Sequence, residues 1–133
     1  MHSSAGRAAR LALAALATLA VIACAGPEAR LGQVRTTDIG PVLVDAKGYT
    51  LYVHAEDPPG ESHCTPACTV YWPPVEPAAG ARAEGDFSII VRQGGTRQWA
   101  YKGKPLYRFA FEVGPGHTGG EGAADGEWHA ARP

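Results

Sequence analysis

The stretch Lys47-Gly48-Tyr49-Thr50-Leu51-Tyr52 returns 55 positions later as Lys102-Gly103-Lys104-Pro105-Leu106-Tyr107. An acid follows each copy at the same distance, Asp57 after the first and Glu112 after the second. A constant offset over several matched positions is typical of a duplicated supersecondary unit. The sequence therefore predicts one domain over 40–131 that is built from two pseudo-symmetric repeats, at about 40–76 and 86–131.

Short β-type segments surround both copies. Residues 41–45 and 49–54 flank a turn that contains glycine and predict a hairpin, and residues 87–92, 97–101 and 105–111 predict a meander. Thr65 suits an N-cap and Pro66 the first helical position, so one short helix is expected at the cysteines. The glycine-rich stretch 112–127 predicts an irregular strap. The expected fold class is all-β, mainly antiparallel hairpins and a meander, with one short helix near the Cys-x-x-x-Cys.

The N-terminus has the features of a targeting segment. Arg7 and Arg10 precede an apolar run over 11–23 that is too short to span a bilayer. The run ends in Val21-Ile22-Ala23-Cys24, which resembles the lipobox of bacterial lipoproteins, in which the cysteine is acylated. We expect a signal peptide over 1–23, lipidation at Cys24 and a flexible tether over 24–39. The alternative is an ordinary secretory signal that leaves a free cysteine.

Charge limits the classes of partner. Removal of the signal peptide, which carries two arginines and no acid, lowers the formal net charge from −1 to −3. A nucleic-acid-binding domain has a basic footprint, so no nucleic-acid partner is expected. The expected partners are the membrane, reached through the N-terminal lipid, and an unknown envelope protein or small molecule. We expect a monomer anchored in a bacterial cell envelope, on its periplasmic or cell-surface side.

Cys64 and Cys68 remain after Cys24 is assigned to the lipid anchor. Two cysteines in an oxidising compartment predict a disulfide, and their spacing on a helical turn permits the geometry. Two alternatives stay open. Thiolates and imidazoles suit copper or zinc, which would draw on His63, Cys64, Cys68 and His54. The pair could also exchange thiols as a redox site. By default no cofactor is expected.

Several motifs in order resemble one known family. They are Gly-x-x-Leu-Tyr followed by an acid, Cys-x-x-x-Cys-x-x-x-Trp-Pro-Pro, Arg-x-Gly-Gly-x-x-Gln-x-x-Tyr-x-Gly-x-Pro-Leu-Tyr, and a glycine-rich stretch that ends in Trp. Over about 40–131 the chain resembles the bacterial secreted-repeat lipoproteins, described by a Tyr-x-(Phe/Trp/Tyr)-x-x-Asp motif. The resemblance implies an envelope lipoprotein whose function is unknown. The first copy departs from the motif with His54 at its aromatic position, and the second keeps Phe109 but has Glu112 for Asp.

Catalytic patterns are absent from the sequence. Glu61, Ser62 and His63 are adjacent, and adjacent residues cannot form the geometry of a triad. There is no Gly-x-Ser-x-Gly, phosphate-binding loop or His-Glu-x-x-His. We therefore expect non-enzymatic binding of a small molecule or an envelope protein. The alternatives are metal handling or thiol redox chemistry at the cysteines, and a purely structural envelope spacer.

The junction of the repeats holds the candidate ligand-binding residues: Tyr52, His54, Asp57, Tyr107, Phe109 and Glu112. A structural interpretation competes with this one. In it, the tyrosine hydroxyls bond to the partner repeat, and the acids accept N–H groups of turns. Trp72 and Trp128, 56 positions apart, are expected to be pseudo-equivalent plugs with one under each repeat.

Overall fold

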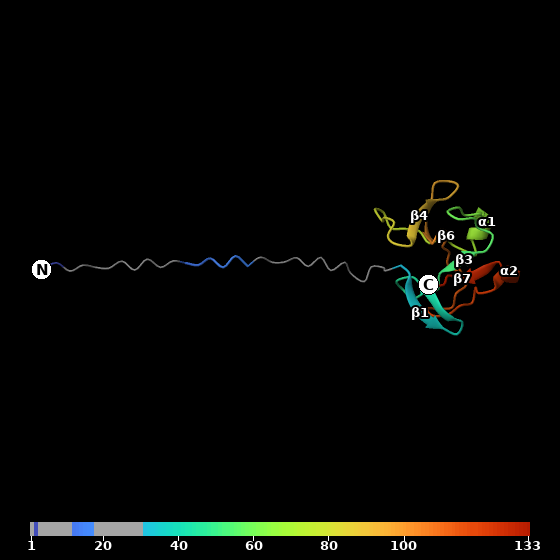
Figure 1. Ribbon diagram of the computed structural model, residues 1–133, viewed down its shortest axis with the longest axis horizontal. Helices are drawn as coiled ribbons and strands as arrows, with labels where there is room; N and C mark the ends of the chain where they lie inside the picture. The colour runs from blue at the N-terminus through green and yellow to red at the C-terminus, as the bar shows by residue number, and fades with distance from the viewer. Residues whose placement is uncertain (1, 3–11, 18–30) are drawn as a thin grey trace.

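The sheets of this protein are formed between the two repeats as well as within them. The computed structural model describes residues 2, 12–17 and 31–133 (Figure 1). Cys24, most of the signal peptide and residues 24–30 of the tether lie outside the described residues, so these assignments stay predictions. In the described part of the chain, no helix is long and apolar enough to cross a membrane.

Repeat 1 begins with a hairpin. Strand β1 (Gln33–Thr37) pairs antiparallel with β2 (Gly40–Val44). The tether predicted to reach residue 39 therefore ends before β1. The side chains of β1 are mostly exposed, so its sequence lacks the apolar alternation that signals a strand, and its partner β2 with buried Val42, Leu43 and Val44 holds it in place.

Repeat 2 contains the predicted meander. Strands β4 (Phe87–Val91), β5 (Arg97–Tyr101) and β6 (Lys104–Pro105) form a three-stranded antiparallel sheet. Strand β6 is much shorter than the segment 105–111 predicted for it. From Leu106 onward the chain leaves this sheet and bonds to repeat 1.

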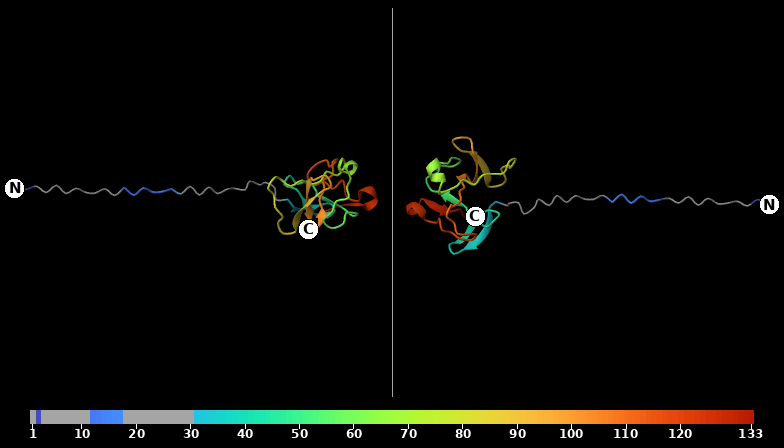
Figure 2. Two further views of the ribbon diagram at one scale, coloured as in Figure 1. Left: turned by 90° about the horizontal axis from the view of Figure 1, so that it is seen from above. Right: turned by 180° about the vertical axis from the view of Figure 1, so that it is seen from behind.

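Each repeat takes its last extended segment from the other one. Strand β3 (Tyr52–His54) of repeat 1 pairs antiparallel with β7 (Trp128–Ala130) of repeat 2. At the equivalent place, the amides of Arg108 and Ala110 donate to the carbonyls of Pro73 and Tyr71. In Figures 1 and 2, the C-terminal red segment accordingly lies against the green β3 of repeat 1.

A pseudo-two-fold axis passes between Tyr52 and Tyr107. The amide of each residue donates to the carbonyl of the other, at 2.8 and 2.9 Å. A second matched pair repeats the relation: Leu43 N donates to Ala131 O, and Trp99 N donates to Val75 O, both at 2.8 Å. Because these bonds cross between repeats, neither half can satisfy its own buried backbone groups alone.

Two single-turn helices occupy matching places in the repeats. Helix α1 (Pro66–Thr69) begins as predicted, with the Thr65 side chain accepting from Cys68 N. Helix α2 (Ala123–Gly126) lies in the glycine-rich strap, where the sequence predicts only irregular structure. Ala124 and Asp125 in α2 have positive φ, and Gly122 before them provides no side-chain cap. The sequence therefore lacks the start signal that marks an ordinary helix.

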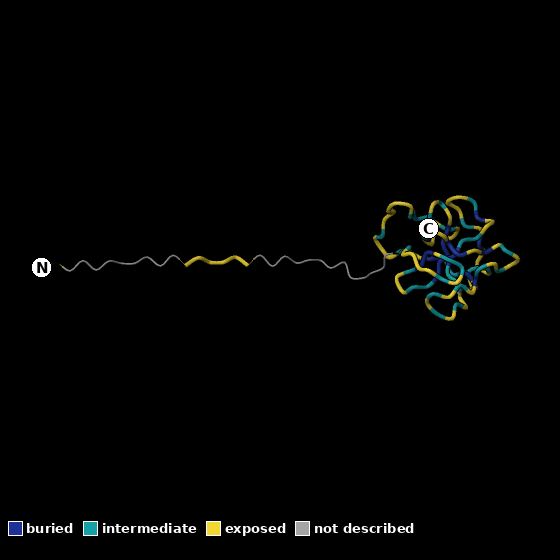
Figure 3. Tube along the Cα trace, turned by 60° about the horizontal axis from the view of Figure 1, so that its bottom comes forward, coloured by how far each residue is buried: buried dark blue, intermediate teal, exposed yellow. Residues whose placement is uncertain are grey.

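The core consists of two apolar clusters, and both repeats contribute to each. One is built around Tyr52, Trp72, Tyr107 and Trp128. The other contains Leu43, Leu51, Val75, Leu106 and Ala131. Figure 3 shows these buried residues gathered at the centre of the domain beneath an exposed shell of loops.

Candidate functional site

Four aromatic rings form a continuous stack at the junction of the repeats. Trp72 and Trp128 lie face to face, with ring centroids 3.9 Å apart and planes 3° apart. His54 covers the outer side of Trp128 at 4.4 Å, and Phe109 covers Trp72 at 5.0 Å. The tryptophans are pseudo-equivalent as predicted, but they stack on each other and do not plug one repeat each.

The repeated tyrosine and acid bond across the two repeats. Tyr107 Oη donates to Asp57 Oδ2 at 2.5 Å, and Tyr52 Oη donates to Glu112 Oε2. The second oxygen of each acid accepts a turn amide, His63 N at 2.7 Å for Asp57 and Gly119 N at 2.8 Å for Glu112. This confirms the structural interpretation of the motif: each tyrosine is fixed by the acid of the other copy.

Burial and a neighbouring carboxylate stabilise the protonated form of both tyrosines. Loss of solvent, followed by the hydrogen bond to Asp57, raises the pKa of Tyr107 from 10.0 to about 12. The pKa of Tyr52 is raised for the same reasons, with Glu112 as its partner. Both tyrosines therefore stay neutral at neutral and moderately alkaline pH.

Alkaline pH should destabilise the fold through these tyrosines. A tyrosine in the unfolded chain ionises near pH 10, whereas folded Tyr107 keeps its proton to about pH 12. A pKa raised by folding contributes stability that is fully present below pH 10 and is lost as pH rises to about 12. The free energy of unfolding, measured with urea from pH 8 to pH 12, should fall above pH 10. The fall should be shallower in Tyr107→Phe, and an identical pH profile in that variant would contradict the assignment.

Both departures from the family motif keep its geometry. His54 is tilted 33° to Trp128, as Phe109 is tilted 32° to Trp72, so the imidazole takes the place of the aromatic ring. Its Nδ1 lies 3.5 Å from Asp57 Oδ1 and, although buried, has no hydrogen-bond partner among the described residues. Glu112 makes the same two kinds of bond as Asp57.

The candidate ligand-binding residues are thus brought together at the junction. Tyr52, Asp57, Tyr107 and Glu112 use their polar atoms on one another and on turn amides. A ligand contact by these residues stays a prediction, and their observed bonds account for the spacing of the motif without one.

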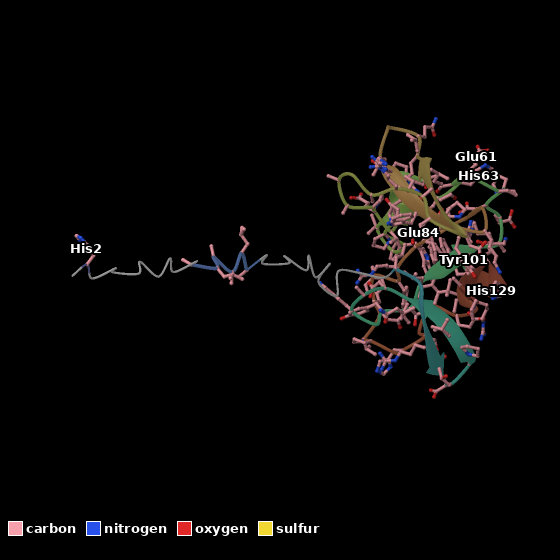
Figure 4. The ribbon with its side chains drawn as sticks, turned by 60° about the vertical axis from the view of Figure 1, so that its left-hand side comes forward. His2, Glu61, His63, Glu84, Tyr101 and His129 are labelled. Atoms are coloured by element: carbon pink, nitrogen blue, oxygen red, sulfur yellow. A yellow bond between two sulfur atoms is a disulfide. The ribbon has the colours of Figure 1, made fainter. Side chains whose placement is uncertain are left out.

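Cys64 and Cys68 form a disulfide beside α1, with Cα atoms 5.3 Å apart. The two histidines proposed for the metal alternative have other partners. His63 is exposed and pairs with Glu61 at 3.2 Å, which Figure 4 shows at the edge of the domain, and His54 stacks on Trp128. Among the described residues, no group of three or more His, Cys, Asp or Glu side chains is placed to hold a metal ion.

Reduction of this disulfide should weaken the fold without abolishing it. A disulfide that closes a loop this short stabilises a domain by about 2 kcal/mol in the chain-entropy model. Gly120 occupies the matching place in repeat 2 and packs against Trp72 and Tyr52, so the same loop can close without a disulfide. Urea unfolding with and without dithiothreitol should show a loss of about 2 kcal/mol. Complete unfolding on reduction would contradict this role.

A buried polar cluster is present that the sequence patterns did not predict. Gln98 is completely buried and donates from Nε2 to Leu106 O at 2.8 Å, and Arg92 donates from Nη1 to Gln98 Oε1 and Ser62 Oγ. A position-by-position comparison of the repeats could have revealed it. The register of the hairpins matches Gln98 to Val42, so the polar residue stands where the other repeat has an apolar one.

One end of the molecule carries exposed apolar side chains. Tyr71 and Phe111 lie with ring centroids 5.7 Å apart and are 53% and 62% exposed. Val70 and Val113 are still more exposed and flank them in sequence. We call these four residues the aromatic patch. The equivalents of these four residues, each in the other repeat, are Gly126, Glu127, Glu56 and Pro58, so glutamates stand at the pseudo-symmetric place where the patch has aromatic rings.

Comparison with known proteins agrees with the duplication seen in the structure. A family model described as a secreted repeat of unknown function matches the chain twice, over residues 33–76 and 88–132. Searches of curated proteins and of solved structures return no match. The first match begins at β1, which confirms that this strand belongs to the repeat. The chain is therefore an exported protein and belongs to the family of secreted repeats of unknown function.

Proposed function

We propose that this chain is a lipid-anchored envelope protein that binds another envelope protein without catalysing a reaction. The lipobox-like Val21-Ile22-Ala23-Cys24 supports the anchor, and membership of a secreted family supports export. Acylation would tether the domain through the short segment before β1. Mass spectrometry of the protein from its native envelope should then find acyl chains on Cys24.

The observation that carries the binding role is the aromatic patch. Large apolar side chains gathered on the surface of a soluble domain are typical of a protein–protein contact. Aromatic residues are enriched in such contacts because they bury a large area with few rotatable bonds. At the pseudo-symmetric place, Glu127 and Glu56 stand where the patch has Tyr71 and Phe111, so the duplicated fold does not require exposed aromatics at these positions.

Site-specific crosslinking tests the patch and offers an internal control. A photoreactive residue is placed at the position of Tyr71 and, in a separate variant, at its pseudo-equivalent Glu127. Ultraviolet irradiation of cells should give one discrete adduct from position 71, absent from position 127. Phe111→Ser should weaken that adduct, because it removes the neighbouring ring. Equal adducts at both positions, or none at position 71, would contradict the proposal.

A further inference from the structure

A groove beside the disulfide contains an arginine that forms no ion pair with an acid of the described residues. We call it the Arg92 groove; it is lined by Ser62, His63, Thr65, Arg92, Gln93 and Thr96, with Glu61 and Glu76 also on its walls. None of the ion pairs formed among the described residues includes Arg92. No residue of the aromatic patch lines this groove, so the two features are separate sites.

The Arg92 side chain is held in one position by uncharged oxygens. Nη1 donates to Ser62 Oγ at 2.6 Å and to Gln98 Oε1 at 2.8 Å, and Nη2 donates to Cys64 O at 2.7 Å. A guanidinium has five N–H donors. Its Nε–H and one N–H of Nη2 therefore have no acceptor in the described part of the chain. A fixed guanidinium with unused donors is suited to carboxylate or phosphate oxygens.

Within the described residues, Arg92 is linked to a carboxylate, that of Asp57, only through a chain of hydrogen bonds that includes the hydroxyls of Ser62 and Tyr107. Because the Tyr107 hydroxyl donates its hydrogen bond to Asp57, Ser62 donates to Tyr107 Oη at 2.6 Å, and Ser62 Oγ accepts from Arg92. Both hydroxyls are neutral. The cationic charge therefore remains at the groove, where an anion can reach it.

The pseudo-symmetric place in the molecule, where each of these residues is replaced by its equivalent from the other repeat, shows that the fold does not need this cluster. The strand registers match Arg92 to Thr37 and Gln98 to Val42, and Thr118 stands in the place of Ser62. The same architecture is therefore built there with an apolar residue and two threonines. The buried Gln98 amide is bonded at its nitrogen to Leu106 O and at its oxygen to Arg92, so Arg92 also compensates the burial of Gln98.

We propose that the Arg92 groove binds a small molecule bearing a carboxylate or phosphate group, with Arg92 as the residue that holds the anion. The hydroxyl of Thr65 or Thr96 and the amide of Gln93 line the same groove and can supply further donors. Glu61 is paired with His63, whereas Glu76 makes no ion pair among the described residues. Glu76 thus opposes the anion and favours a ligand with a single small anionic group.

Nuclear magnetic resonance titration of the intact exported domain tests the site. Inorganic phosphate and acetate are added separately, with chloride at the same ionic strength as the reference. Amide shifts should follow a single saturable curve at Ser62, His63 and residues 93–96 for at least one of the two anions. The curve that saturates also tells which anionic group the groove prefers. No saturable shift at these residues with either anion would overturn the proposal.

Three variants decide whether Arg92 is responsible. Arg92→Gln should weaken binding at least tenfold, whereas Arg97→Gln should leave it unchanged, because Arg97 is exposed and donates to Ala81 O outside the groove. Glu76→Gln removes a repelling charge without disturbing any bond of Arg92 and should strengthen binding roughly twofold or more. It is the decisive variant if Arg92→Gln fails to fold. Equal weakening by Arg92→Gln and Arg97→Gln, or no strengthening by Glu76→Gln, would overturn the proposal.

Discussion

Replacing Trp128 with alanine is expected to lower the free energy of unfolding by about 3–5 kcal/mol. Trp128 is 3% exposed and contacts three rings at once: Trp72 on one face, His54 on the other and Tyr107 at its edge. Its removal opens the centre of the stack and leaves His54 and one face of Trp72 without a neighbouring ring. A domain of this size is stabilised by only about 5–15 kcal/mol, so the variant should lose a large part of its stability. Urea unfolding followed by circular dichroism measures the loss.

The other two tryptophans are matched controls for this result. Trp72→Ala should cost about as much as Trp128→Ala, because Trp72 contacts Trp128, Phe109 and Tyr52 in the equivalent way. Trp99→Ala should cost less, since Trp99 is only half-buried and its one aromatic contact is an edge-on approach to Phe87. If Trp99→Ala proved the most damaging of the three, the stack would not be the centre of the fold.

A double-mutant cycle should find the coupling between tyrosine and acid across the repeats. Tyr107→Phe and Asp57→Ala are each expected to cost about 1–3 kcal/mol, because each leaves a buried polar group without its partner. Their combined cost should be smaller than the sum by more than about 1 kcal/mol, since the two side chains share one hydrogen bond. Urea unfolding of the wild type, the two single variants and the double variant gives this coupling energy.

The control cycle pairs residues of the same motif copy. Tyr52 and Asp57 belong together in the sequence, but Tyr52 bonds to Glu112 and Asp57 bonds to Tyr107. Tyr52→Phe and Asp57→Ala should therefore be close to additive, whereas Tyr52→Phe and Glu112→Ala should be coupled. Strong coupling within one copy and none between copies would show that the motif works locally, contrary to the bonds observed here.

The duplication could be read from the sequence because it rests on local patterns. Matched Leu-Tyr and acid positions revealed two repeats, β-branched runs revealed the strands of the meander, and Thr65-Pro66 marked the start of α1. The cysteine pair in an exported chain predicted the disulfide that the structure contains. Each of these signals depends on residues that are close together in the chain.

The pairing of strands between repeats could not be predicted from the local sequence. Strand β3 has the composition of a strand whether it pairs with its own hairpin or with β7, and only tertiary contacts decide between them. For the same reason, Tyr52 could not be assigned to Glu112 by spacing alone. Strand β1 and helix α2 were missed because one has mostly exposed side chains and the other is a single turn with two residues of positive φ.

Comparison of the two repeats separates the residues that the fold requires from the residues that are available for binding. The tyrosines, the acids and the stacked rings occur in both halves and hold the domain together. The aromatic patch and the Arg92 groove each combine side chains of both repeats, and each occurs at only one of its two pseudo-symmetric places. Both proposals about binding rest on that asymmetry, and the symmetric residues of the motif serve the fold.

Separating the two repeats tests the central claim, which is that each repeat is completed by the other. Residues 31–80 and 81–133 can be produced as two chains, because the cut falls in an exposed loop. Each chain alone lacks the partner for its β3 or β7 strand and half of the ring stack, so each should show the narrow amide dispersion of an unfolded polypeptide in its NMR spectrum. Mixed in equal amounts, they should recover the spectrum of the intact domain. A native spectrum from either chain alone would contradict the claim.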